Sequence, residues 1–234
     1  MDVHARPASN ADTQLPRVVE ESVTTRELIL SRVRAGLVDV PAAEDPEDVV
    51  VPRGYLRALD VDVVERFVER ISEYKTTVRR VSRSGVPQAI EEQLSSRGLR
   101  RIAAPPDVPD EWRPEDMHFV TGALDAPALD RVDGALTGCA LAIAETGTIV
   151  LDGGARQGGR ALSLVPDYHL CIVRERQIVG TVPEAMALIA PTIRRMLRPV
   201  TFVSGPSATS DIELSRVEGV HGPRTLDVFV LSGA

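Results

Sequence analysis

Apolar side chains recur at helical spacing in the first half of the chain and also form short strand-like runs between the helices. A helix beginning at Asp62 carries a single apolar face, formed by Val64, Phe67, Val68, Ile71 and Tyr74. Strand-like runs at residues 76–81 and 99–103 enclose another helix at 87–97. This alternation favours a parallel or mixed sheet with helices packed on its faces.

Apolar runs become denser in the second half of the chain. The pattern there predicts a long helix at 181–197 and strands at 117–121, 139–144, 146–151, 169–173, 200–203 and 226–231. We therefore expect one α/β domain over residues 55–234, with a mixed, mostly parallel sheet and helices on both faces.

Residues 1–54 differ in composition from the rest and form a separate region in this prediction. Residues 1–22 are rich in polar residues and proline, which indicates a flexible, solvated tail. Thr24 and Glu27 have capping-box spacing for a helix with one apolar face, and residues 40–52 form an acidic, proline-containing linker. That face must be buried on the domain, on another copy or on a partner, and we expect a partner.

Composition narrows the functional classes. Of the 234 residues, 43% are hydrophobic, which supports a real core. Only 3% are aromatic and the net charge is −7, so a nucleic-acid partner is not expected. The sequence shows no apolar run of about 20 residues and no signal-peptide pattern at its start, so we expect a cytoplasmic protein without a membrane span.

Two cysteines, Cys139 and Cys171, lie within apolar runs. Such positions favour two buried thiols over a disulfide. An iron–sulfur centre of the usual kind needs more thiolates than this chain has, so we expect no metal and no cofactor in the chain itself.

Glu145 interrupts what is otherwise core sequence, because apolar runs lie on both sides of it. A carboxylate between buried strands must be paired, hydrogen-bonded or neutral, and such environments are frequent at active sites. The alternative is that Glu145 points outward from a strand end or a bulge beside Gly147.

A glycine-rich loop, DGGARQGGR at residues 152–160, follows the second of these strands. It does not match G-x-G-x-x-G, so a dinucleotide site is not supported. Its backbone N–H groups and its two arginines are suited to a carboxylate or phosphate. A mobile surface loop would have the same composition.

A second polar turn follows the strand at 200–203. Gly205 and Pro206 break the strand, and Ser210 with Glu213 has the capping-box spacing of a helix start. Loops beyond the carboxyl ends of strands are where α/β sheets bind ligands. Simple turn and cap formation is the alternative.

Charged groups near this turn suggest an anion-handling unit that faces Glu145. Asp211 lies in the first expected helical turn, and Arg224 enters the following strand after a Gly-Pro turn. Asp211 could cap the helix, pair with Arg224 or hold a histidine tautomer. We expect a pocket where the loops after Leu151 and Ser204 meet His169 and His221, since histidine changes charge near neutral pH.

Four motifs carry a family resemblance: AETGT, PxxH, SGPSxTxDIE and GVHGP, in this order. Over roughly residues 55–234 the chain resembles the lactate-utilization protein C family and its LUD domain. The glycine-rich loop departs from that family, in which it is closer to SxPGQGR. The resemblance implies a fold like that of the sugar-phosphate isomerases and coenzyme A transferases.

The resemblance also implies a role in L-lactate oxidation to pyruvate, together with a cysteine-rich protein and an iron–sulfur protein that hold the clusters. The chain would then be a non-redox subunit. It could instead be an enzyme of coenzyme A transferase or isomerase type, since AETG looks like the glutamate-glycine motif of those transferases. A third possibility is a regulator that binds a small carboxylate.

The candidate site residues fall into two groups. Glu145, His169 and His221 are the candidates for proton transfer or nucleophilic chemistry. The candidates for binding a small carboxylate or a phosphate-bearing ligand are Gly158, Arg160, Ser204, Gly205, Ser207, Thr209, Asp211 and Arg224.

Overall fold

A computed structural model describes residues 24–41, 45, 50, 52, 54–209, 217–219 and 221–233. The chain divides into two units, residues 1–53 and 54–234. In the first, helix α1 (Thr25–Gly36) begins with the predicted capping box: the Thr24 hydroxyl accepts from the Glu27 N–H, and the Glu27 carboxylate accepts from the Thr24 N–H. No residue of α1 is buried among the described residues.

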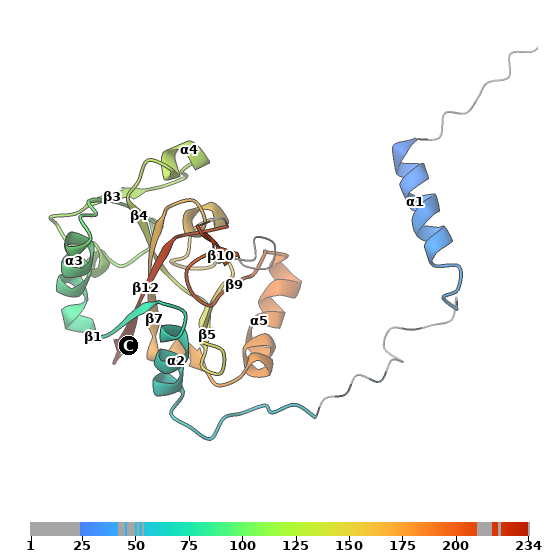
Figure 1. Cartoon of the computed structure of the whole chain (residues 1–234), viewed down its shortest axis with the longest axis horizontal. Helices are drawn as coiled ribbons and strands as arrows, with labels where there is room; N and C mark the ends of the chain where they lie inside the picture. The colour runs from blue at the N-terminus through green and yellow to red at the C-terminus, as the bar shows by residue number, and fades with distance from the viewer. Residues whose placement is uncertain are drawn as a thin grey trace, which may run out of the picture. The chain divides into compact units, whose positions relative to one another are not determined.

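The second unit is built on a six-stranded sheet in which every neighbouring pair is parallel (Figure 1). Its order is β1-β12-β7-β4-β2-β3. The strands are β1 (Thr77–Ser82), β2 (Arg101–Ala104), β3 (His118–Thr121), β4 (Gly134–Gly138), β7 (Tyr168–Arg174) and β12 (Thr225–Ser232). The expected mostly parallel α/β sheet is confirmed.

Helices pack on both faces of this sheet, as predicted. Helix α3 (Val86–Ser96) and the 3₁₀ turn η3 (Asp110–Trp112) cover one face, where Ile90 and Trp112 contact the cluster around Leu170. Helix α2 (Val63–Ser72) covers the other face, where Phe67 and Ile71 are fully buried. The apolar stripe that predicted α2 is therefore its core face.

A separate four-stranded sheet has the order β8-β5-β6-β9, in which β5–β6 and β6–β9 are antiparallel and β5–β8 is parallel. Its strands are β5 (Leu141–Ile143), β6 (Thr148–Leu151), β8 (Ile178–Val179) and β9 (Thr201–Val203). Helix α5 (Val182–Met196) packs on it through Ala185 and Ile189, and the opposite face shares the core beneath α2. The sheet therefore lies between α5 and the parallel sheet.

The remaining elements are short. They are η2 (Arg83–Gly85), α4 (Ala126–Leu129), η4 (Arg160–Ser163), η5 (Glu175–Gln177) and the antiparallel ribbon β10 (Ala208–Thr209) with β11 (Val217–Glu218). Cys139 and Cys171 are buried free thiols, as predicted. Among the described residues, no helix has the length and apolar character needed to span a bilayer.

Strand β4 was not among the predicted elements. Its sequence, GALTG, begins and ends with glycine, which weakens any strand signal. A Cβ at Gly134 would lie 2.7 Å from Cδ1 of Tyr168 on the neighbouring strand. Glycine is therefore needed there because the Tyr168 ring packs against the β4 backbone.

Candidate functional site

The glycine-rich loop at residues 152–160 is closed by two of its own side chains. The Asp152 N–H donates to Oε1 of Gln157 over 2.8 Å, and Nε2 of Gln157 donates to Oδ1 of Asp152 over 2.8 Å. The Gly154 N–H donates to the same carboxylate oxygen over 2.9 Å. Gln157 is 5% exposed, so its amide holds the loop from inside.

The loop is also bound to the carboxyl edge of the parallel sheet. The Gly138 N–H, at the end of β4, donates to the Arg156 carbonyl over 2.7 Å. The Arg156 N–H donates to Oδ2 of Asp107 over 2.7 Å. Gly158 has φ +67°, and a Cβ there would lie 2.7 Å from Cδ2 of Leu162. The loop is thus built into the ligand-binding edge of an α/β fold.

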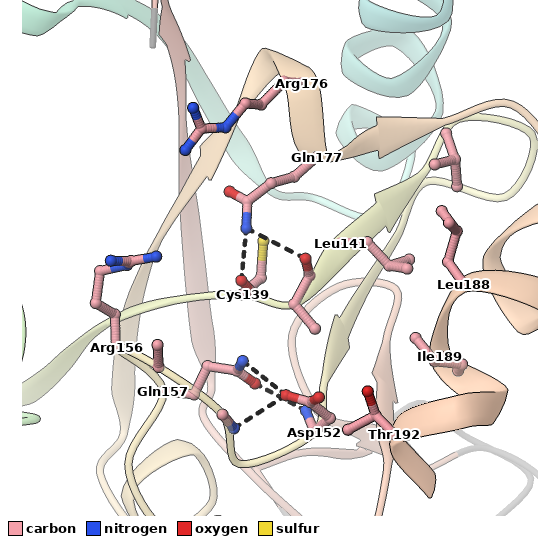
Figure 2. Close-up of a pocket in the computed structure, with 14 residues that line it drawn as sticks. Cys139, Leu141, Asp152, Arg156, Gln157, Arg176, Gln177, Leu188, Ile189 and Thr192 are labelled. Carbon is pink, nitrogen blue, oxygen red and sulfur yellow. Dashed lines mark hydrogen bonds between the residues drawn. The ribbon is translucent and has the colours of Figure 1, made fainter.

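The larger of two arginine-lined cavities at this loop, of about 430 Å³, lies between the loop, η5 and α5 (Figure 2). One side carries Arg156 and Arg176, and Leu188 and Ile189 of α5 lie at the other (Figure 2). Gln177 anchors the backbone that leads from β4 into β5, because its Nε2 donates to the Cys139 carbonyl over 2.7 Å and to the Ala140 carbonyl over 3.2 Å. The cavity therefore combines a cationic wall with an apolar wall.

Arg156 and Arg176 belong to a larger arginine cluster. The pKa of Arg174, at the end of β7, is lowered by burial and then by the positive charges of Arg156, Arg176 and Arg83. The Arg174 guanidinium lies over the Trp112 ring, 5.7 Å from its centroid. Among the described residues, none of Arg156, Arg174 and Arg176 forms an ion pair.

A smaller cavity, of about 180 Å³, lies against another part of the same loop. Gly158 and Arg160, both predicted as ligand contacts, line it together with Arg198 and Thr201. Nη1 of Arg160 donates to Oγ1 of Thr201 over 3.0 Å. Nη1 of Arg198 donates to the Gly153 carbonyl over 3.1 Å. Two guanidinium groups are thus held at a space of small-molecule size, an arrangement suited to an anion.

Glu145 lies in the tight turn between β5 and β6, and its side chain is exposed. Its N–H donates to the Gly180 carbonyl over 3.0 Å. Of the two positions considered for this carboxylate, the outward one at a strand end is found. Glu145 lines neither of the two arginine-bearing cavities.

Ser204 lies beside the hairpin formed by β5 and β6, and Gly205 follows it directly in the chain. A chain of hydroxyl groups joins Oγ1 of Thr146 to Oγ1 of Thr148, and Thr148 to Oγ of Ser204, with each step 2.7 Å long. Gly205 has φ +135°, and a Cβ there would lie 2.5 Å from the Cβ of Tyr74. The AETGT and SGPS motifs therefore meet at the carboxyl-terminal end of α2.

His169 is buried within the parallel sheet. Its Nε2 lies 2.7 Å from Oγ1 of Thr137 on the neighbouring strand β4. Burial lowers the pKa of His169 from 6.5 to about 4, so the imidazole is neutral at physiological pH. It lines neither cavity.

Ser207, His221 and Arg224 gather in one turn. The Ser207 hydroxyl accepts from the His221 N–H over 3.0 Å, and the Ser207 N–H donates to the Pro223 carbonyl over 2.8 Å. The His221 side chain is exposed. Arg224 pairs over 2.7 Å with Asp167, and both of these side chains are largely exposed.

The expected helix start beyond this turn is only partly within the described residues. Thr209 lies in β10, where it pairs with Val217 of β11 in an antiparallel ribbon. It therefore belongs to a strand rather than to the flank of a helix. Ser210 and Asp211 lie outside the described residues, so the roles considered for Asp211 remain predictions.

In place of the expected single pocket, two cavities lined by arginines lie at the loop after Leu151. Sequence reasoning singled out that loop but missed Arg174, Arg176, Gln177 and Arg198. A usable signal was present, because VRERQ follows the buried run YHLCI directly. Polar residues immediately after a parallel strand lie at the ligand-binding edge of the sheet.

Comparison with known proteins gives consistent matches. The LUD domain family model matches residues 126–231. A protein from Deinococcus radiodurans named "Lactate utilization protein C" is 43% identical over 221 residues, covering 94% of this chain and 99% of the relative. A protein of the same name from Geobacillus thermodenitrificans is 27% identical, covering 73% of this chain and 79% of the relative.

A solved structure is similar as well. It is the crystal structure of a DUF162 family protein from Deinococcus radiodurans, which is 40% identical and superposes with a TM-score of 0.63. The match covers 73% of this chain and 97% of that one.

Proposed function

Because this chain belongs to the lactate-utilization protein C family, whose LUD domain it carries, we propose that it is a non-redox subunit of a system that oxidises L-lactate to pyruvate. In this proposal the electrons pass through iron–sulfur clusters held by a cysteine-rich protein and an iron–sulfur protein. The cysteine count supports this division, because the two buried thiols fall short of the four thiolates of a usual cluster.

The smaller cavity is the proposed site for the carboxylate of L-lactate or pyruvate. The observation that carries this proposal is the pair of guanidinium groups, Arg160 and Arg198, at a space of about 180 Å³. A planar guanidinium donates two parallel hydrogen bonds to a carboxylate. A volume of this size suits a three-carbon acid and leaves little room for a larger ligand.

The chain's own residues would bind and orient the acid. Thr201 fixes the direction of Arg160, and the Gly153 carbonyl fixes Arg198, so both cations are positioned before a ligand arrives. The Asp152–Gln157 contacts hold the glycine loop that forms the remaining wall.

Reconstitution tests the subunit role. The chain alone, the two partners alone and all three together would be assayed for L-lactate-dependent reduction of an electron-accepting dye. We expect activity only when the partners are present, with the highest rate in the full mixture. Activity of the isolated chain would contradict the non-redox role.

Calorimetric titration with L-lactate and pyruvate tests the site. Removing one charged donor to a carboxylate costs about 1.5–3 kcal/mol, so Arg160→Gln and Arg198→Gln should each weaken binding by about tenfold or more. Arg131→Gln, an exposed arginine that lines neither cavity, is the matched control. Unchanged affinity in both test variants would contradict the proposed site.

The same assays separate the two alternative functions. A regulator that binds a small carboxylate would bind L-lactate but leave the partners' dye reduction unchanged. An enzyme of coenzyme A transferase or isomerase type would use Glu145 as base or nucleophile, and the nearby Thr146–Thr148–Ser204 hydroxyl chain is the feature that favours it. In the subunit proposal, Glu145→Gln leaves lactate oxidation by the full mixture unchanged.

A further inference from the structure

We propose that the larger cavity is a second binding site, separate from the lactate site, for an organic phosphate with an apolar body. Its phosphate would lie between Arg156 and Arg176, and its body would lie along the α5 wall formed by Leu188 and Ile189 (Figure 2). This site adds a second ligand class to the proposed function and does not depend on where lactate binds.

The charge of the cavity favours a dianion. Arg156 and Arg176 lie close enough to Arg174 for their positive charges to lower its pKa. Among the described residues, none of the three arginines forms an ion pair. The protein as a whole carries a net charge of −7, so an uncompensated positive cluster is a local feature. A phosphate monoester offsets more of this repulsion than a monocarboxylate does.

The carboxylates near these arginines are already engaged. Asp107 accepts from the Arg156 N–H over 2.7 Å. Asp152 is the one acidic side chain among the described residues that line this cavity, and its Oδ1 accepts hydrogen bonds from the Gly154 N–H and from Nε2 of Gln157. Among the described residues neither carboxylate forms an ion pair with Arg156 or Arg176, so these guanidinium groups are available to a ligand. Guanidinium forks suit phosphate geometry, which makes arginine effective at phosphate sites.

Size and apolar lining favour a ligand with more than a phosphate group. The cavity of about 430 Å³ is more than twice the volume of the smaller one. Leu141, Val179, Leu188 and Ile189 supply an apolar wall, and Leu188 is 58% exposed. An apolar body placed there would remove this surface from water, which stabilises binding in proportion to the area covered.

The sole tryptophan provides a direct readout. Trp112 lies beside Arg174, whose guanidinium stacks over its ring, so an anion that repositions the arginine cluster should change Trp112 fluorescence. The full-length chain would be titrated with phenyl phosphate, inorganic phosphate, benzoate and phenol at fixed ionic strength, by fluorescence and by calorimetry. We expect phenyl phosphate to bind most tightly, because it alone supplies both the dianion and the apolar body.

Variants locate the site. Arg156→Gln and Arg176→Gln should each weaken phenyl phosphate binding by about tenfold or more, whereas Arg131→Gln should not. Leu188→Ser, on the exposed apolar wall, should weaken phenyl phosphate binding while leaving the weaker binding of inorganic phosphate unchanged. Full affinity in both arginine variants, or benzoate binding as tightly as phenyl phosphate, would overturn the proposal.

The result is separable from the lactate proposal. Arg176 does not line the smaller cavity, so Arg176→Gln should bind L-lactate like the unmodified chain. Loss of phenyl phosphate binding with retained lactate binding supports two sites. If phenyl phosphate and L-lactate compete and both depend on Arg160, a single site exists and the second-site proposal is wrong.

Discussion

A buried carboxylate near the amino end of the parallel sheet is paired, whereas three arginines at its carboxyl end have no ion-pair partner among the described residues. Near the amino end of β12, the Asp227 carboxylate is fully buried and accepts from Arg97, from Gln93 and from the Tyr168 hydroxyl, at 2.7–2.9 Å. At the carboxyl end, Arg156, Arg174 and Arg176 have no ion-pair partner among the described residues. A saturated network is suited to holding the fold, whereas an unsaturated cluster remains free to bind an anion.

The largest expected effect on the unfolding free energy comes from disrupting the hydrogen-bond network around Asp227. Asp227→Asn removes the negative charge that pairs with Arg97 and accepts a hydrogen bond from Gln93. Breaking a buried ion pair costs about 3–5 kcal/mol of unfolding free energy. Urea denaturation would measure it. Asp167→Asn is the control, because it breaks the exposed pair with Arg224 and should cost under about 1 kcal/mol. Equal losses in the two variants would remove the contrast between buried and exposed charge.

Lowering the pH should reduce the stability of the fold, because the imidazole of His169 is buried in its neutral form. The pKa of His169 is about 4 in the folded chain against 6.5 in a model peptide, so the unfolded state binds the proton more tightly between these values. Stability from neutral His169 is fully present above about pH 6.5 and falls by about 3 kcal/mol as the pH drops toward 4. The pH dependence of the unfolding free energy would measure it.

His169→Gln provides the comparison for this acid effect. Glutamine does not titrate and retains an amide that can reach the Thr137 hydroxyl, which His169 contacts in the native chain. The variant should therefore lose less stability than the unmodified chain between pH 6.5 and 4. Parallel pH curves for the two proteins would mean that the imidazole does not remain neutral in the fold.

A smaller effect on stability is expected from deleting one hydrogen bond to Asp227 while the charge of this carboxylate is kept. Tyr168→Phe deletes one hydrogen bond to Asp227, while the Arg97 pair and the Gln93 bond remain. The pKa of Tyr168 is raised by burial and by the Asp227 charge, so the phenol is a donor at all physiological pH values. The expected loss is about 1 kcal/mol in thermal or urea unfolding, well below that of Asp227→Asn.

Periodicity was sufficient to predict most of the fold. The stripe of Phe67 and Ile71 identified α2, and the Thr24–Glu27 pair identified the start of α1, because both signals are local. Strand β4 was missed because it begins with a glycine, Gly134, that packing against Tyr168 requires, and Tyr168 is far along the chain. The division of the strands between the six-stranded and the four-stranded sheet also depends on strand pairings that no local pattern encodes.

The site was predictable only in part, for a similar reason. The glycine-rich loop was recognisable from composition, and Gly158 and Arg160 do line a cavity. Arg174, Arg176 and Arg198 come from other elements, so only the folded chain shows that they gather around this loop. Gly147, within AETGT, has a packing role: its φ is +62°, and a Cβ there would lie 2.5 Å from the Ile71 backbone nitrogen. A motif glycine can therefore reflect helix packing rather than ligand contact.

The smallest effect on stability is expected at the carboxyl end of the parallel sheet, where the arginine cluster has no ion-pair partner among the described residues. Arg176→Gln removes one positive charge from a cluster whose repulsion lowers the pKa of Arg174. No ion pair with a described residue is lost and the side chain is exposed, so the unfolding free energy should stay within about 0.5 kcal/mol, with any change toward greater stability. Tm and urea midpoints of the ligand-free variant would test this, with Arg131→Gln as the neutral reference. If Arg176→Gln destabilises the ligand-free chain as much as Tyr168→Phe does, the guanidinium has a structural partner, and the carboxyl edge would hold its charges as the amino edge does.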